Sequence, residues 1–163
     1  MRIGATIGLV EVVEAGERGT APAVELLAAA GFVRASEDVA AGPPPDTVVL
    51  YALDGAGGRG TGDPVGVLLG STVMDILVDD LEWARAGLVQ YIAVRPDMRR
   101  RHVGTELLRG YLLRFDDLRV VDVVLPPGPT DRLLAFYGPF GFAPLPTDPH
   151  VLRLVLPSRH LDV

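Results

Sequence analysis

Two kinds of apolar periodicity alternate along the chain, and their order constrains the fold more than any other feature. Alternating or continuous apolar runs, typical of strands, cover residues 5–14, 47–54, 63–74, 88–94, 119–125 and 151–156. Apolar residues at helical spacing cover residues 20–32, 101–115 and 130–138. This β-α-β-β-β-α-β-α-β order predicts an α+β (mixed α/β) sheet, antiparallel in its first half, with a later crossover helix and helices on both faces.

The remaining segments carry weaker patterns. Residues 34–46 predict a loop with at most a short helical turn, and residues 139–149 predict a loop. Residues 75–87 are ambiguous between helix and strand. The whole chain, 1–163, is expected to form a single domain, because a chain of this length can bury one real core.

Composition excludes several chemistries. The chain has no cysteine, and all 15 of its basic residues are arginines. Disulfides, a cysteine nucleophile, Schiff-base chemistry and a Walker lysine are therefore excluded. The three histidines, His102, His150 and His160, lack metal-ligand spacing, so no metal site is expected.

The charge balance argues against a nucleic-acid partner. A net charge of -6 supplies no broad basic face for phosphates, and it suits a cationic substrate. The first residues make a poor signal peptide, and no apolar run approaches the roughly 20 residues needed to cross a bilayer. A cytoplasmic protein with no membrane partner is expected.

The stretch "VRPDMRRRHVGTELLRGYLL" places Arg99, Arg100 and Arg101 between a predicted strand and a predicted helix. Unpaired N–H groups and the positive end of the helix dipole would meet the arginine side chains there, which favours an anion site. Gly104 allows close approach to the backbone, and Thr105 adds a hydroxyl donor. The alternative is a solvated basic helix start.

A second glycine-rich segment, "GAGGRG" at 55–60, matches a dinucleotide-binding pattern in its letters alone. A strand follows it rather than a helix, so no helix start is available for a pyrophosphate. A hairpin tip is the better interpretation.

The sequence resembles the GNAT superfamily of acyl-coenzyme A dependent N-acetyltransferases. "IAVRP" is similar to the end of the family's central strand, and "RRRHVGTELL" to its R/Q-x-x-G-x-G/A signature, with Arg99 first and Gly104 last. "TDRLLAFYGPFGF" resembles a downstream family segment. The resemblance covers the chain from about residue 47 and, more loosely, the first helix. It implies a GNAT fold, with a mostly antiparallel twisted sheet of 6 to 7 strands.

The resemblance also implies an activity: transfer of an acetyl group from acetyl-CoA to a primary amine of a small molecule or peptide, by direct attack. Backbone N–H groups from Arg100 to Thr105 would hold the pyrophosphate, and those of Ile92 and Val94 the pantetheine arm. The full cofactor-binding set that the resemblance implies is Ile92, Ala93, Val94, Arg99, Arg100, Arg101, His102, Val103, Gly104, Thr105 and Thr130.

For catalysis, the resemblance places Tyr137 as the general acid that protonates the departing thiolate; the alternative is a core aromatic residue. The strand at 88–94 has no carboxylate, so the candidate for the base is Glu82, with Asp79 and Asp80 beside it as further candidates. A solvated acidic loop is the alternative for these carboxylates. Trp83 would line an acceptor pocket or act as a buried anchor.

The chain departs from the family pattern at several positions. His102 stands at the signature's first glycine, Thr130 at a frequent asparagine and Leu133 at an alanine, while Gly138 and Pro139 should end the last helix early. Thr130 is still expected to cap that helix. The altered glycine, the missing carboxylate on the strand at 88–94 and the early helix end favour an alternative function, a weak or inactive GNAT-like module that binds acyl-CoA or a protein partner. A homodimer, common in the family, stays open.

Overall fold

The computed structural model describes residues 10–55, 62–78 and 82–156, and for residues 73–78 and 82–83 the backbone alone. The strands are β1 (Val10–Glu14), β2 (Thr47–Asp54), β3 (Pro64–Val78), β4 (Glu82–Val94), β5 (Val120–Val124), β6 (Ala143–Leu145) and β7 (Asp148–Val155). The α-helices are α1 (Ala21–Ala29), α2 (Val33–Ala40), α3 (Val103–Arg114) and α4 (Asp131–Tyr137). Short 3-10 helices are η1 (Gly16–Arg18), η3 (Pro96–Met98) and η4 (Gly138–Phe140).

The strands form one seven-stranded sheet in the order β1-β2-β3-β4-β5-β7-β6. β1 pairs with β2 antiparallel, β4 with β5 parallel, and β7 with both β5 and β6 antiparallel. The chain between β4 and β5 contains α3, as the predicted crossover requires. The predicted mixed α+β class and mostly antiparallel sheet are confirmed.

The chain divides into two compact units, and both β3 and β4 run through the two. The first comprises Met1–Gly70 with Tyr91–Asp116, and the second Ser71–Gln90 with Asp117–Val163. The single domain over 1–163 stays a prediction. Among the described residues, no helix combines the length and the apolar character that a membrane span requires.

The prediction of a loop over 34–46 is wrong for its first half, where α2 forms. Ala35, Ser36 and Val39 make the buried face of this helix. The Ser36 hydroxyl is buried because it donates a hydrogen bond to the carbonyl oxygen of Val24 at 2.8 Å. Because Ser36 is polar but buried, the sequence of α2 does not show the apolar spacing that predicts a helix.

Two other segments also turn out to be strands. The ambiguous residues 75–87 extend β3 to Val78 and begin β4 at Glu82. The predicted loop at 139–149 contains β6 and the first residues of β7. Pro144 is tolerated in β6 because β6 is the last strand of the sheet, and its pairing with β7 shifts register there.

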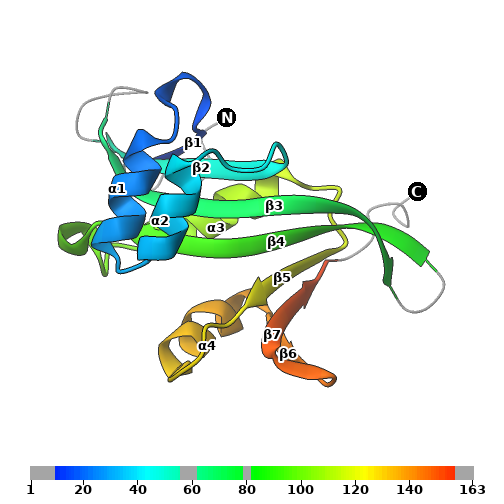
Figure 1. The fold of residues 1–163 in the computed structure, drawn as a ribbon. Coiled ribbons are helices and arrows are strands. Elements are labelled where there is room, and N and C mark those ends of the chain that lie inside the picture. The colour runs from blue at the N-terminus through cyan, green and yellow to red at the C-terminus, as the bar shows by residue number, and fades with distance from the viewer. Residues whose placement is uncertain (1–9, 56–61, 79–81, 157–163) are drawn as a thin grey trace. The chain divides into compact units, whose positions relative to one another are not determined.

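In the first unit, helices cover both faces of the sheet (Figure 1). α1 and α2 pack against Tyr51 and Leu53 of β2 and against residues of β3 and β4 in one buried cluster. α3 lies on the opposite face, where a Cβ atom on Gly66 of β3 would stand 2.9 Å from Val103 Cγ1. The missing side chain at Gly66 therefore lets the first turn of α3 approach the sheet.

A buried tyrosine secures the start of α1. The Tyr51 hydroxyl accepts the N–H of Ala23 at 3.1 Å and donates to the Gly19 carbonyl oxygen at 2.8 Å. Thr20 occupies the N-cap position of α1, yet its side chain makes no capping hydrogen bond. Tyr51 serves the free N–H group of the first turn instead.

Replacing Tyr51 by phenylalanine should lower the free energy of unfolding by about 1–3 kcal/mol, because a buried N–H and a carbonyl oxygen lose their shared partner. Urea denaturation of the two proteins measures the difference. Equal midpoints would show that the hydroxyl contributes nothing to the stability of this helix start.

Candidate functional site

The end of β4 directs backbone groups away from β3. The Arg95 N–H donates to the Val65 carbonyl oxygen of β3 at 2.8 Å. Backbone N–H and C=O groups of successive residues point to alternate edges of a strand. The groups of Ile92 and Val94 therefore point to the edge of β4 that faces away from β3. β4 continues to Val94 beyond its last pair with β5, Val89↔Val123.

In the loop after β4, the first arginine, Arg95, is paired with a carboxylate. Arg95 donates to both carboxylate oxygens of Asp97, at 2.6 Å from Nε and 3.0 Å from Nη2. This hydrogen bonding lowers the pKa of Asp97 and raises that of Arg95. Met98 is buried and anchors the loop. The charge of Arg95 is thus balanced locally.

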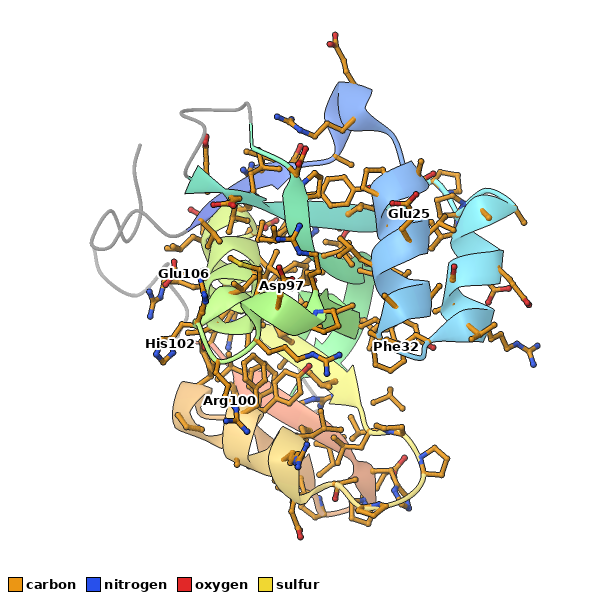
Figure 2. The ribbon with its side chains drawn as sticks, turned by 90° about the vertical axis from the view of Figure 1, so that its left-hand side faces the viewer. Glu25, Phe32, Asp97, Arg100, His102 and Glu106 are labelled. Atoms are coloured by element: carbon orange, nitrogen blue, oxygen red, sulfur yellow. The ribbon has the colours of Figure 1, made fainter. Side chains whose placement is uncertain are left out.

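The three following arginines supply the positive charge of the loop. Arg99 Nε makes a long contact, 3.4 Å, with the carbonyl oxygen of Val94. Arg100 and Arg101 are exposed, and in the described part of the chain neither has an ion-pair partner within 4 Å. Figure 2 shows Arg100 and His102 in this loop, with Glu106 one turn along α3.

The first turn of α3 offers backbone donors beside these arginines. The first N–H bonded within the helix is that of Glu106, which donates to the His102 carbonyl oxygen at 3.0 Å. The N–H groups of Val103, Gly104 and Thr105 precede it and have no intrahelical acceptor. The buried side chain of Val103 holds this turn on the sheet, so the donors are fixed in place.

His102 occupies the N-cap position of α3 in the left-handed conformation, with φ 61° and ψ 21°. Its side chain makes no capping hydrogen bond. Glycine adopts this conformation without steric cost, which explains why the signature has glycine at this position. The resemblance located the residue, and the backbone angle gives the physical reason.

Tyr137 lies in the second unit, at the end of α4. Its ring meets Phe136 at a centroid distance of 4.9 Å and Phe142 at 5.3 Å, edge-on in both cases. It is 5% exposed, and this burial raises its pKa from 10.0 to about 12. The phenol therefore keeps its proton at neutral pH. Its acid role stays a prediction.

The raised pKa makes stability sensitive to alkaline pH. An unfolded tyrosine ionises near pH 10 and the folded Tyr137 near 12, so the part of the free energy of unfolding that depends on Tyr137 should be constant below pH 10. It should then fall by up to about 3 kcal/mol as pH rises to 12. Denaturation of wild type and Tyr137→Phe across this range measures the loss. Both proteins should also lose a smaller amount of stability through Tyr51, whose pKa burial also raises. If the total loss is equal in the two proteins, the pKa of Tyr137 is not raised by the fold.

Two further parts of the expected site have different outcomes. α4 ends at Tyr137 and Gly138 begins η4, so the predicted early helix end is confirmed. Thr130 stands at the N-cap of α4, but the predicted side-chain cap is wrong because no such hydrogen bond forms. Its contact with a cofactor stays a prediction.

The candidate carboxylates fall mostly outside the described structure. Glu82 lies in β4 instead of the loop suggested as an alternative, and its side chain, like that of Trp83, is among those not described. Asp79 and Asp80 lie outside the described residues, as does most of the glycine-rich segment at 55–60. The base therefore stays a prediction.

Sequence reasoning missed two features close to the site. Gly66 gives α3 its seat on β3, and the signal was an isolated glycine inside an apolar strand pattern. Tyr91 of β4 packs against Phe32, which follows α1, with ring centroids 5.0 Å apart. No local pattern links these two aromatic residues, because they are distant in sequence.

Comparison with known sequences finds no match, either among profiles of protein families or among curated proteins. Comparison with solved structures finds many. The ribosomal-protein-S18-alanine N-acetyltransferase from Escherichia coli superposes with a TM-score of 0.67 at 12% identity, over 95% of this chain and 99% of that one. Arabidopsis thaliana NAA60 in complex with a bisubstrate analogue gives 0.65 at 11% identity, over 91% and 99%.

A GNAT family acetyltransferase from Brucella melitensis in complex with acetyl-CoA gives a TM-score of 0.62 at 17% identity, over 91% of this chain and 89% of that one. At these identities the likeness establishes a shared fold. The present chain therefore has the fold that these acetyltransferases have in common.

Proposed function

We propose that this chain, which has the GNAT fold, is an N-acetyltransferase that moves an acetyl group from acetyl-CoA to a primary amine of a small molecule or peptide. The observation that carries the proposal is the donor set at the end of β4 and the start of α3. Outward backbone groups of Ile92 and Val94 lead directly to a turn of free N–H groups beside exposed arginines. The neighbour with bound acetyl-CoA supports the same use of this fold.

The donor set fits coenzyme A in chemical type. The N–H groups of the first turn of α3, with Arg99–Arg101 beside them, suit a pyrophosphate. The backbone groups of Ile92 and Val94 suit the amide groups of the pantetheine arm, which would add to the strand as a further strand does. Ala93, with its buried side chain, keeps that stretch of β4 on the core.

Acetyl-CoA supplies an acetyl thioester, and the chain must position three groups around it. A backbone N–H of Ile92 or Val94 would stabilise negative charge on the carbonyl oxygen as the amine nitrogen attacks. The new C–N bond forms and the C–S bond breaks. Tyr137, which retains its proton, would give it to the departing sulfur.

The attacking amine must also lose a proton. We assign this step to Glu82, acting through water, because it is the carboxylate that β4 itself provides. Asp79 and Asp80 remain the alternatives. Glu82→Gln should lower the rate and shift its pH dependence, and if both stay unchanged the base lies elsewhere.

The acceptor is proposed to be a cationic amine, since the net charge of -6 attracts such substrates and repels nucleic acid. Polyamines, aminoglycosides and peptide N-termini all fit that description. We further propose a cytoplasmic location, and a homodimer remains an open alternative to the monomer.

A second function, acyl-CoA binding without turnover, is favoured by one observation. The backbone at His102 has the conformation of a glycine, yet it carries a bulky side chain on the phosphate loop. Acetyl transfer to any amine in the proposed class would exclude this alternative.

Charge reversal tests the anion site. Arg99→Glu with Arg100→Glu should weaken acetyl-CoA binding about tenfold or more at low salt, because two cations become anions beside the phosphates. The loss should shrink as salt rises, since exposed charges are screened. Isothermal titration calorimetry measures both effects.

Arg34→Glu is the matched control, because Arg34 is an exposed arginine on α2, outside the loop. The affinity of the Arg34→Glu variant for acetyl-CoA should stay close to that of wild type. If the double variant binds as tightly as Arg34→Glu at every salt concentration, the anion site is not in this loop.

A further inference from the structure

One face of the sheet in the second unit bears exposed apolar side chains. Its strands β5, β7 and β6 lie side by side (Figure 1). Residues directly opposite each other in two paired strands share a face of the sheet, and so do alternate residues of one strand. By the pairing of β5 with β7, one face, here called the valine face, consists of Val120, Asp122, Val124, Val151, Arg153 and Val155. On this face Val124 is 56% exposed and Val155 is 61% exposed.

The opposite face of the same two strands is covered. Its residues are all buried, and they are Val121, Val123, Leu152 and Leu154. A Cβ atom on Gly141, which follows η4, would stand 3.2 Å from Leu154 Cδ1, so the chain after α4 packs on this side. The exposure of Val124 and Val155 shows that the valine face has no comparable cover.

An ion pair lies at the centre of the valine face. Arg153 donates to both carboxylate oxygens of Asp122, at 2.8 Å from Nε and 2.9 Å from Nη2. Both side chains are already mostly buried, so covering them further adds little desolvation cost. In the described part of the chain, Arg153 Nη1 donates to no acceptor, and a carboxylate can accept more than two hydrogen bonds. The pair can therefore bond to groups from outside.

The valine face is complementary to itself. Suppose that two copies pack face to face, related by a two-fold axis that runs parallel to the strands, midway between β5 and β7. The axis exchanges the positions of the two strands. Arg153 of one copy then lies over Asp122 of the partner subunit, and Val124 lies over Val151 of the partner subunit. Each exposed valine meets a valine, and each charge meets its opposite.

Charge favours a second copy of this chain over a partner of another kind. The net charge of -6 makes two copies repel each other, so they can meet only through a surface that carries no net charge. The valine face has one arginine and one aspartate, and it is neutral. A uniformly charged partner would gain nothing from this pair.

The distribution of exposed apolar side chains also selects this face. Among the described residues, the other large exposed apolar side chains are Val33, Leu113 and Leu134. They lie singly on three different helices, α2, α3 and α4. Single exposed apolar residues are normal on a protein surface, whereas a group on one open sheet face indicates an interface.

We propose that the valine face is the interface of a homodimer, in which the Arg153–Asp122 pairs of the two copies join in one network of four charges and the valines around it exclude water. The interface involves few strands, and small interfaces associate reversibly. The dimer should therefore form and dissociate with protein concentration. This inference goes beyond acetyl transfer and does not depend on it.

Sedimentation equilibrium tests the proposal. As the concentration of the wild-type chain rises from about 1 µM to about 1 mM, its mean mass should increase from that of one chain toward that of two. Val124→Asp with Val155→Asp should stay monomeric over this range, because the added carboxylates would be brought together and desolvated. Both positions are exposed, so the fold should survive, and circular dichroism checks this.

Val33→Asp is the matched control. Val33 is also a valine, 57% exposed, but it lies on α2 in the first unit. Its replacement adds the same charge at the same exposure, away from the valine face. This variant should dimerise like wild type.

A charge swap tests the two-fold arrangement itself. Asp122→Arg with Arg153→Asp keeps an ion pair within each chain, and the swapped chain should still dimerise with itself. In a mixed dimer with wild type, arginine would face arginine and carboxylate would face carboxylate. Native mass spectrometry of the swapped chain with isotope-labelled wild type should show mixed dimers about tenfold or more below the statistical amount.

Three results would overturn the proposal or part of it. Wild type that stays monomeric at every concentration would show that the valine face does not bind a second copy. A folded Val124→Asp, Val155→Asp variant that dimerises like Val33→Asp would place the interface elsewhere. Free mixing of the swapped chain with wild type would contradict the contact between Arg153 and Asp122 of the partner subunit. Acetyl transfer is measured separately, so none of these results decides the proposed function.

Discussion

Tyr137→Phe is expected to slow acetyl transfer by about 10²- to 10³-fold while acetyl-CoA binds as before. The departing thiolate would lose the group that protonates it, and general acid catalysis contributes on this scale. The phenol carries the proton that the role requires, because a tyrosine is protonated at neutral pH, and burial, which raises the pKa of Tyr137 to about 12, makes it hold that proton more tightly. The ring contacts with Phe136 and Phe142 are available to phenylalanine too, so the fold should survive.

Steady-state kinetics with calorimetric binding of acetyl-CoA separates the two effects. Tyr51→Phe is the control, because it also removes a buried tyrosine hydroxyl but lies in the support of α1. Assayed well below its melting temperature, it should turn over like wild type. An unchanged rate in Tyr137→Phe would leave Tyr137 as a core aromatic residue.

Gly66→Val should have the largest effect on the structure of the site. A Cβ atom there would stand 2.9 Å from Val103 Cγ1 and 3.1 Å from Leu107 Cδ1, and valine adds two methyl groups beyond it. Overpacking of this kind costs about 1–3 kcal/mol or more. Because Val103 begins α3, we expect both a lower melting temperature and weaker cofactor binding.

Differential scanning calorimetry should show a melting temperature lower by about 2–4 °C for each kcal/mol lost. Gly66→Ala should lie between wild type and valine. Gly138→Ala, where an added Cβ meets nothing within 4 Å and φ is -53°, should be neutral. If Gly66→Val has the same melting temperature as wild type, α3 does not depend on its close contact with Gly66.

The strand, loop and helix of the site were predictable because each has its own local signal. β4 ends at Val94 as predicted, before Pro96, and α3 follows the arginines with apolar residues at helical spacing. α2 was not predictable, because its buried face includes Ser36, which needs a partner in α1 to be buried. β6 was hidden in the same way, since its three residues form a strand only by pairing with β7.

In the candidate site, too, features that depend on adjacent residues were predictable, and features that depend on distant contacts were not. The sequence was sufficient to place positive charge at a helix start, since that depends on adjacent residues. The left-handed backbone of His102 and the seat provided by Gly66 depend on how the loop packs against the sheet. Likewise, the absence of side-chain caps at Thr20 and Thr130 reflects backbone geometry rather than residue type.

The most direct test of acetyl transfer is release of the coenzyme A thiol. Because the chain has no cysteine, a thiol-reactive chromophore will report only the thiol of the product. With acetyl-CoA and a panel of polyamines, aminoglycosides and peptides with free N-termini, we predict thiol release that requires both the protein and at least one amine. Acetyl-CoA binding with no release above the protein-free rate for any amine would contradict an acetyltransferase and leave a binding module.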